Sequence, residues 1–297
     1  MGAAIDAALI ENPSTDELVL PAGTFAGDYT VPSGVVLRGA NAGSKATAAA
    51  RANETILSGS ATLVGDAIID GVTLEAKPII TDATDSFTAK GVRFDGIVVP
   101  QGDHAQMATI APQTPLWNQS IKLDFEDCYF SGTENVYNAF ELNFQVADGS
   151  VIKGNEFSEA VGSHNVINIY DVEDGGTINI TDNHFAKSVN AIRIGVKGDK
   201  AAEINIVNNE YDTTDMTSPE WGGLVLIQPY ATATISMKDV VVNINGTVNN
   251  TENPQIYYYY AGANDAALGY DNKPKIYIDG HRVTAEELVD RSPNPTP

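Results

Sequence analysis

A six-residue pattern of apolar and polar positions recurs along the middle of this chain. The template is apolar-x-x-Asn-x-aromatic, and its clear copies run from Ile152 to Phe157, from Ile180 to Phe185 and from Ile206 to Tyr211. Weaker copies come earlier, with Val72, Val92 and Cys128 in the Asn position and Leu74, Phe94 and Phe130 in the aromatic position. Successive aromatic positions are 20, 36, 27, 28 and 26 residues apart. A period of this size predicts an architecture of stacked repeats.

A second short segment follows each later copy, and it also alternates apolar and polar residues. These segments are 138–142, 165–169, 190–194 and 222–226. Alternation predicts strands with one buried and one wet face, and Gly, Asp and Asn turns such as 172–176 separate them. No helical period interrupts residues 56–250, which argues against a βαβ fold, and a sandwich or barrel has no reason to repeat one motif at this period. The pattern therefore predicts an all-β fold, a parallel β-solenoid in which like residues form ladders.

The Asn position predicts a structural ladder inside the solenoid. Stacked Asn side chains can bond the neighbouring backbone and one another. The alternative is that these residues only occupy turns, where Asn is common, but the fixed offset to an aromatic residue favours the ladder. Its members are Asn155, Asn183 and Asn209, with Phe130, Phe157, Phe185 and Tyr211 as the aromatic column. Cys128 is the only cysteine, so it forms no internal disulfide, and its place in the Asn column predicts a buried residue.

The two ends of the chain differ from the repeats. Residues 3–11 have apolar residues near helical spacing and predict a short helical cap over the open end. A hairpin is predicted around Asp279-Gly280, followed by a capping-box turn that begins at Thr284. The chain is thus divided into 1–253, the solenoid with its N-terminal cap, and 254–297, a β-rich C-terminal cap or an oligomerisation or attachment element. A strand over the four tyrosines 257–260 would put two on each face. The outward pair then serves an interface or binds a sugar, or the segment is only a last amphipathic strand.

The charge is strongly acidic, with 17 basic against 39 acidic residues among 297. This argues against nucleic acid and anionic membranes as partners, and no apolar run is long enough to span a bilayer. The acidic excess either keeps an edge-rich protein soluble or binds calcium at turns that contain Asp171, Glu173 and Asp174. The first residues lack the basic region of a signal peptide. We therefore expect synthesis in the cytoplasm without a signal peptide, with a secreted, extracellular protein as the alternative if a leader was removed.

A resemblance to a known superfamily comes from the first third of the chain. Residues 17–25, 29–43, 51–59 and 69–74 resemble the opening coils of right-handed parallel β-helix proteins of the pectate-lyase-like superfamily. With the later coils, the resemblance covers roughly residues 3–250. It implies a right-handed parallel β-helix and is weak for function, because the superfamily includes polysaccharide lyases, glycoside hydrolases, phage tailspikes, adhesins and non-enzymatic virion surface proteins.

Candidate catalytic residues are few. Uronate lyases of this superfamily need a basic proton abstractor and a calcium ion or cationic group, for which Arg193 with Lys197 is the best local pair. Arg193 lies between Ile192 and Ile194, so it should point away from the core. The nearby polar residues of the repeat are Glu141, His164, Asn168 and Asp171. This column is either a polar groove floor or, as is more frequent, a solvated face. An insertion loop at 100–119, with Trp117, is the best place for a binding feature or a subunit contact.

These features favour a non-enzymatic structural protein displayed on a virion surface, such as a phage capsid decoration or head-fibre subunit, with glycan binding as an added role. Its expected partners are further copies, in a trimer for instance, a capsid or other virion protein, and a surface polysaccharide. The alternative is a polysaccharide lyase or glycoside hydrolase, including a tailspike depolymerase. No cofactor is expected, with calcium as the alternative, and neither nucleic acid nor membrane is a partner.

Overall fold

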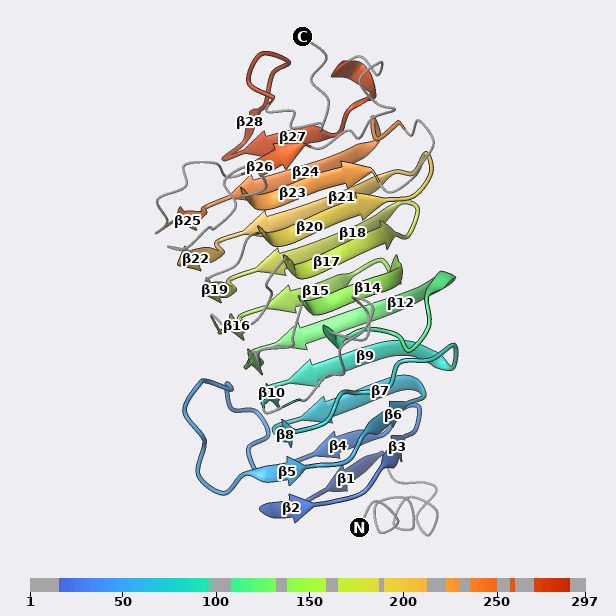
Figure 1. The fold of residues 1–297 in the computed structure, drawn as a ribbon, viewed down its shortest axis with the longest axis vertical. Coiled ribbons are helices and arrows are strands. Elements are labelled where there is room, and N and C mark those ends of the chain that lie inside the picture. Colours follow the sequence, from blue (N-terminus) through green and yellow to red (C-terminus); the bar gives the residue numbers. More distant parts are fainter. Residues whose placement is uncertain are drawn as a thin grey trace.

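The computed structural model describes residues 16–95, 97, 108–131, 138–158, 165–186, 190–212, 223–229, 236–249, 257–259 and 270–288. Short strands stack along one long axis, from β1 at one end to β27 and β28 at the other (Figure 1). The helix expected at 3–11 lies outside the described residues. Within those residues, helical structure is confined to the short 3-10 turn η1 (Tyr270–Asn272) and the single turn after Thr284. No described helix is long and apolar enough to cross a membrane.

Three sets of parallel strands account for the stack. Sheet I contains β1 (Glu17–Val19), β4 (Val36–Arg38), β7 (Gly65–Asp70), β9 (Thr84–Lys90), β12 (Leu116–Glu126), β15 (Ser150–Lys153), β18 (Gly176–Thr181), β21 (Ala202–Val207), β24 (Val240–Asn245) and β27 (Lys275–Ile278). Sheet II contains β2 (Gly23–Phe25), β5 (Thr55–Leu57), β8 (Thr73–Leu74), β10 (Arg93–Phe94), β13 (Tyr129–Phe130), β16 (Glu156–Phe157), β19 (His184–Ala186), β22 (Glu210–Asp212) and β25 (Val248–Asn249). Sheet III contains β11 (Ala108–Ile110), β14 (Asn138–Val146), β17 (Asn165–Val172), β20 (Asn190–Val196), β23 (Gly223–Pro229) and β26 (Tyr257–Tyr259). Near the first end, β3 (Tyr29–Val31) pairs with β6 (Ala61–Leu63).

From β10 to β27 the described strands belong to sheets II, III and I in turn, and each strand pairs in parallel with its equivalent in the next coil. Ile152 thus pairs with Ile180, and Ile180 with Ile206. The predicted all-β fold of stacked parallel strands is confirmed at this level, as a solenoid-like architecture. The long strand β12 joins two sheets, because its first half pairs with β14 and its second half with β9 and β15. The insertion at 100–119 was predicted as a loop, but β11 and the start of β12 lie within it.

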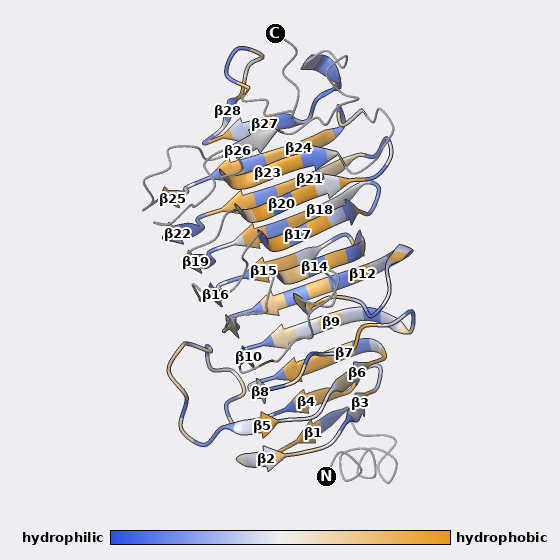
Figure 2. Ribbon diagram, in the orientation of Figure 1, coloured by the Kyte–Doolittle hydropathy of each residue, from blue (hydrophilic) through white to orange (hydrophobic). Residues whose placement is uncertain are grey.

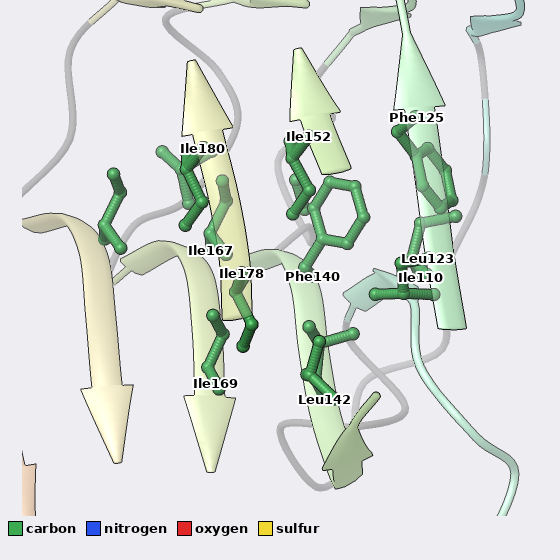
Figure 3. Close-up of a cluster of buried hydrophobic side chains, with 14 of the residues drawn as sticks. Ile110, Leu123, Phe125, Phe140, Leu142, Ile152, Ile167, Ile169, Ile178 and Ile180 are labelled. Atoms are coloured by element: carbon green, nitrogen blue, oxygen red, sulfur yellow. The ribbon is translucent and has the colours of Figure 1, made fainter. Parts of the chain in front are cut away.

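The core lies between the sheets. Hydrophobic and hydrophilic residues alternate along the strands (Figure 2). Ile152 and Ile180 of sheet I face Phe140 and Ile167 of sheet III (Figure 3). The aromatic column of sheet II stacks ring on ring, with centroids 4.5–5.2 Å apart from Phe94 through Phe130, Phe157 and Phe185 to Tyr211. Each such pair contributes about 0.5–1.5 kcal/mol beyond the burial of its surface.

The ladder asparagines lie at the corner between sheets I and II, and all three are buried. The Asn155 Nδ2 group donates to Asn183 Oδ1 at 3.0 Å, and Asn183 Nδ2 donates to Asn209 Oδ1 at 3.0 Å. The same oxygens accept the backbone N–H groups of Asn155 and Asn183, each at 3.0 Å. Because the corner removes these N–H groups from the strand pairing, the ladder supplies the partners that buried backbone requires.

The residue before each ladder position has a left-handed backbone conformation. Gly154, Asp182 and Asn208 have φ of 67°, 56° and 54°. Gly, Asn and Asp tolerate this region better than other residues. The corner therefore restricts the residue type at two consecutive positions, the left-handed residue and the ladder asparagine that follows it. Cys128 occupies the same corner one coil earlier, and its N–H donates to Asn155 Oδ1 at 2.9 Å. Its thiol donates to the carbonyl of Ala89, and burial raises its pKa, which keeps the sulfur protonated.

A long connection, residues 39–54, lies against the same corner of later coils. Arg51 donates to the carbonyl of Gly91 at 2.6 Å and forms an ion pair with Glu54 at 3.0 Å. The N–H of Ala46 donates to the carbonyl of Asp127 at 2.8 Å. A Cβ on Gly91, where φ is 54°, would lie 2.2 Å from the carbonyl oxygen of Ser44. The connection therefore fastens coils that are distant in the sequence, and glycine leaves room for it.

The predicted C-terminal hairpin is confirmed. β28 (His281–Arg282) pairs antiparallel with β27 through a turn in which Asp279 and Gly280 both have positive φ. The capping-box turn is also present, since the N–H of Thr284 donates to Glu287 Oε2 at 2.9 Å. β26 and β27 pair in parallel with β23 and β24. Strands on both sides of residue 253 therefore share sheets. The side chains of the tyrosines 257–260 lie outside the described residues.

Candidate functional site

The sequence-predicted candidates lie on the outer side of sheet III. Glu141 pairs with Asn168, and Asn168 pairs with Arg193, as expected for stacked coils. Their neighbours along each strand point into the core, so these three side chains project outward. They are nevertheless buried, with exposed fractions of 1% for Glu141, 2% for Asn168 and 8% for Arg193. The expectation of a solvated face is therefore wrong here: every residue of β17 is buried, so both sides of this strand are covered.

The three side chains form one hydrogen-bonded network, which will be called the sheet III network. Glu141 accepts from Asn168 Nδ2 at 2.7 Å and from the Tyr170 hydroxyl at 2.6 Å. Arg193 donates from Nη1 to Asn168 Oδ1 at 2.7 Å and from Nε to Gln228 Oε1 at 2.9 Å. Asn168 thus connects the carboxylate to the guanidinium, because its amide forms one hydrogen bond with each of them. Buried charges need such partners, because an unpaired one would cost several kcal/mol.

Aromatic rings extend the network. The Arg193 guanidinium lies 4.8 Å from the centroid of the Tyr170 ring, and Trp117 contacts Tyr170 edge-on at 5.8 Å. The Lys197 ammonium lies 3.1 Å from the centroid of the Trp117 ring. Burial, followed by the charge of Glu141, raises the pKa of Tyr170, so its hydroxyl stays a donor. Burial lowers the pKa of Lys77 to about 8, although the negative charge of Glu141 opposes this shift.

The acidic candidates for calcium have other partners. Asp171 accepts the backbone N–H of Lys197 at 2.9 Å through Oδ1 and pairs with the Lys200 ammonium at 2.8 Å through Oδ2. Glu173 accepts the N–H of Asp148 at 2.9 Å, and Asp174 accepts the N–H of Ala201 at 2.9 Å. No group of three or more potential His, Cys, Asp or Glu ligands converges within the part of the chain that the structure describes. These carboxylates therefore act as acceptors at the corner between sheets III and I.

The structure brings some of the predicted residues together and separates others. Arg193 and Glu141 share the sheet III network, whereas the Lys197 side chain turns to Trp117 and its backbone to Asp171. His164 lies outside the described residues. Sequence reasoning did not select Tyr170, Gln228, Lys77 or Asn138, although Asn138 also donates to Glu141. One signal was present: Asn138, Asn165 and Asn190 begin successive strands of sheet III, and the N–H of Asn165 donates to Asn138 Oδ1 at 3.0 Å.

The network's geometry limits its chemistry. A general base must reach the proton that it abstracts. Arg193 is only 8% exposed, its guanidinium donates hydrogen bonds to Asn168 and Gln228, and it lies over the Tyr170 ring. Glu141 is more enclosed still, with an exposed fraction of 1%. The partly exposed groups at the margin are Trp117, Lys77 and Lys197. Comparisons with known proteins give no assignment, since the chain matches no family model, no curated protein and no solved structure.

Proposed function

We propose that this chain is a right-handed parallel β-helix of the pectate-lyase-like type that serves as a non-enzymatic structural protein on a particle surface, with a phage virion as the particle. The observation that carries the non-enzymatic part is the sheet III network. The residues that the sequence marks for catalysis are buried and bonded to one another. A hydrogen bond to a charged group contributes about 1.5–3 kcal/mol, so the network joins coils instead of presenting reactive groups.

The repeated ladders support a role as a rigid rod. Each coil contacts its neighbours through paired strands, stacked rings and shared side-chain amides, and such an arrangement gives stiffness along one axis. The net charge of −22 favours solubility and discourages indiscriminate association of a long surface protein. In this proposal the segment 254–297 provides attachment or oligomerisation, and the partners are further copies, a capsid protein or another virion protein. A secreted, extracellular location is the alternative to the virion.

A carbohydrate-active enzyme is the second candidate, and one observation favours it. Trp117, Tyr170 and Lys197 place rings and a cation beside Glu141, and aromatic residues next to a few polar groups are typical of ligand sites. In this alternative the protein is a polysaccharide lyase, a glycoside hydrolase or a tailspike depolymerase. The same cluster would provide glycan binding without cleavage in the structural protein.

One experiment separates the two candidates. The protein is incubated with acidic and neutral polysaccharides, with calcium and with chelator, while new unsaturated bonds and new reducing ends are followed. We expect no cleavage. Cleavage that Arg193→Ala abolishes, while the matched variant Lys122→Ala on the exposed outer side of sheet I retains it, would make the protein an enzyme. Circular dichroism of both variants shows whether each is folded.

The particle assignment has its own test. Antibodies against the purified protein are applied to phage particles prepared from the source of the gene, and gold labelling is viewed by electron microscopy. We expect the label on the particle surface, and denatured particles should release a protein band that the same antibodies recognise. Particles without label or band would overturn the virion assignment and leave the structural assignment to the cleavage assay.

A further inference from the structure

A second asparagine ladder runs along the outer side of sheet I. Asn179, Asn205 and Asn243 pair in register on β18, β21 and β24. Asn205 Nδ2 donates to Asn179 Oδ1 at 3.2 Å, and Asn243 Nδ2 donates to Asn205 Oδ1 at 2.8 Å. These side chains are half-buried rather than enclosed, so their remaining donors and acceptors face the surroundings of the protein.

The residues beside this ladder carry little charge. On one side lie Thr177, Glu203 and Val241, and on the other Thr181, Val207 and Asn245, all in register on the same three strands. Together with the three ladder asparagines they will be called the amide face. Glu203 is its only charged residue, and its Oε1 accepts from Asn243 Nδ2 at 3.1 Å. Apart from Glu203, the amide face thus offers Thr and Asn side chains and β-branched apolar groups.

The same side of sheet I is different in its first half. There Arg38 pairs with Asp70 at 3.4 Å, and Lys90 pairs with Asp124 at 3.7 Å. Lys90 also approaches Glu126 at 3.5 Å. The columns that carry ion pairs in the earlier coils are therefore occupied by Asn, Thr and Val in β18, β21 and β24. This change along one sheet does not follow from the fold, because both halves have the same strand geometry.

Charge decides which partner the amide face fits. A chain with a net charge of −22 repels its own copies over most of its surface. Two copies approach at the lowest electrostatic cost where their surfaces are neutral, and amides and hydroxyls lose less on leaving water than ions do. We propose that the amide face is the docking surface for a second copy of this chain. It is an extended, half-buried sheet surface whose amides can bond to the same groups on the partner.

The test is the mass of the 297-residue chain in solution, with two variants that add one charge each. Val207→Lys places an ammonium on the amide face without touching the asparagine ladder. Ile68→Lys is the matched control, because Ile68 is a half-buried β-branched residue on the outer side of β7 in the same sheet. Sedimentation equilibrium should give an oligomer for the wild type and for Ile68→Lys. We expect Val207→Lys to weaken the association by roughly tenfold or more.

Three outcomes overturn the proposal: a wild-type protein that is monomeric at every concentration, a Val207→Lys variant that assembles like the wild type, or equal weakening by both variants. A neutral glycan that binds a monomeric wild type and loses binding in Val207→Lys would identify a different occupant and also refute it. If Val207→Lys does not fold, as judged by circular dichroism, Thr177→Lys tests the other margin of the same face. None of these measurements depends on whether the protein is found on virions or cleaves polysaccharides.

Discussion

Replacing Asn183 by Leu tests the inner ladder at its centre. The substitution removes two acceptances and two donations. Asn183 Oδ1 accepts from the backbone N–H and from Nδ2 of Asn155, both at 3.0 Å. Its Nδ2 donates to the carbonyl of Ile152 at 2.8 Å and to Asn209 Oδ1 at 3.0 Å. The position is 1% exposed, so water cannot replace these bonds without opening the corner.

The size of the effect follows from which groups are left without partners. Asn155 Nδ2 keeps its bond to the carbonyl of Phe125 at 3.0 Å, and Asn209 Oδ1 keeps the backbone N–H of residue 183 at 3.0 Å. The Asn155 N–H and the Ile152 carbonyl lose the bonds described, and each buried group without a partner costs about 1–3 kcal/mol. Burying a Leu side chain returns about 1.5–3 kcal/mol, but its branched end meets groups that need hydrogen bonds. We expect a net loss of about 1–3 kcal/mol.

Urea unfolding followed by circular dichroism measures this change from the midpoint and the slope. The matched control is Asn118→Leu, since Asn118 is an exposed asparagine on β12, and it should stay within about 0.5 kcal/mol of the wild type. A midpoint of Asn183→Leu equal to that of the control would refute the account of the ladder as a set of backbone partners. A changed slope would show that single coils unfold separately, in which case hydrogen exchange of the Asn155 N–H gives the local effect.

Three further changes test other parts of the structure. Gly91→Ala should destabilise the fold by roughly 1–3 kcal/mol, because φ is 54° and the new Cβ meets the Ser44 carbonyl at 2.2 Å; an unchanged urea midpoint would contradict this packing. Partial burial raises the pKa of Glu54, but hydrogen bonds from Arg51 and Thr73 outweigh the burial and lower the pKa overall. The ionised Glu54 therefore stabilises the fold fully above the pKa that it has in the unfolded chain, and this stabilisation is lost as pH falls through its pKa in the folded protein. Glu54→Gln should be less stable near pH 7 and lose less of its urea midpoint on acidification, and parallel curves for the two proteins would refute the ion pair's role. Burial lowers the pKa of Lys77 from 10.5 to about 8. Charged Lys77 therefore lowers the folding stability below pH 8, and the stability should rise between about pH 8 and 10.5, where the folded state loses the proton before the unfolded state does. Lys77→Met should flatten this rise in the urea midpoint, and a rise equal to that of the wild type would show that Lys77 titrates normally.

The inward positions were predictable from the sequence because each coil gives them the same neighbours. Phe157 meets Phe130 and Phe185 in register, so one residue type suits every coil and repeats visibly. The corner adds a second requirement, a left-handed residue before each asparagine, which the pairs Gly154-Asn155 and Asp182-Asn183 satisfy. Periodicity in the sequence therefore reports the core and the corners of this fold.

The outward positions were not predictable in the same way. Alternation placed Arg193 outside the core, but it gives no information on what covers the outer side of a sheet. The burial of Arg193 depends on sheet III being covered on both sides, and its partners Asn168 and Gln228 come from neighbouring coils 25 and 35 residues away. Trp117 was assigned to an insertion loop, yet it lies in β12 and contacts Tyr170. These contacts join parts of different coils, for which the sequence shows no repeated signal.

The two asparagine ladders show how one residue type takes two roles in the same coil. Asn183 follows a left-handed residue at a corner, where backbone groups need partners, and its amide bonds to backbone as well as to asparagine. Asn179 lies four residues earlier, on the outer side of β18, where the backbone is already paired with β15 and β21, and its Oδ1 accepts from Asn205 Nδ2. Loss of an inner asparagine must therefore cost stability, whereas an outer one can change with little effect on folding. Because Asn179, Asn205 and Asn243 contribute little to folding, the presence of a single charged residue, Glu203, in the amide face fits the proposal that this surface serves association.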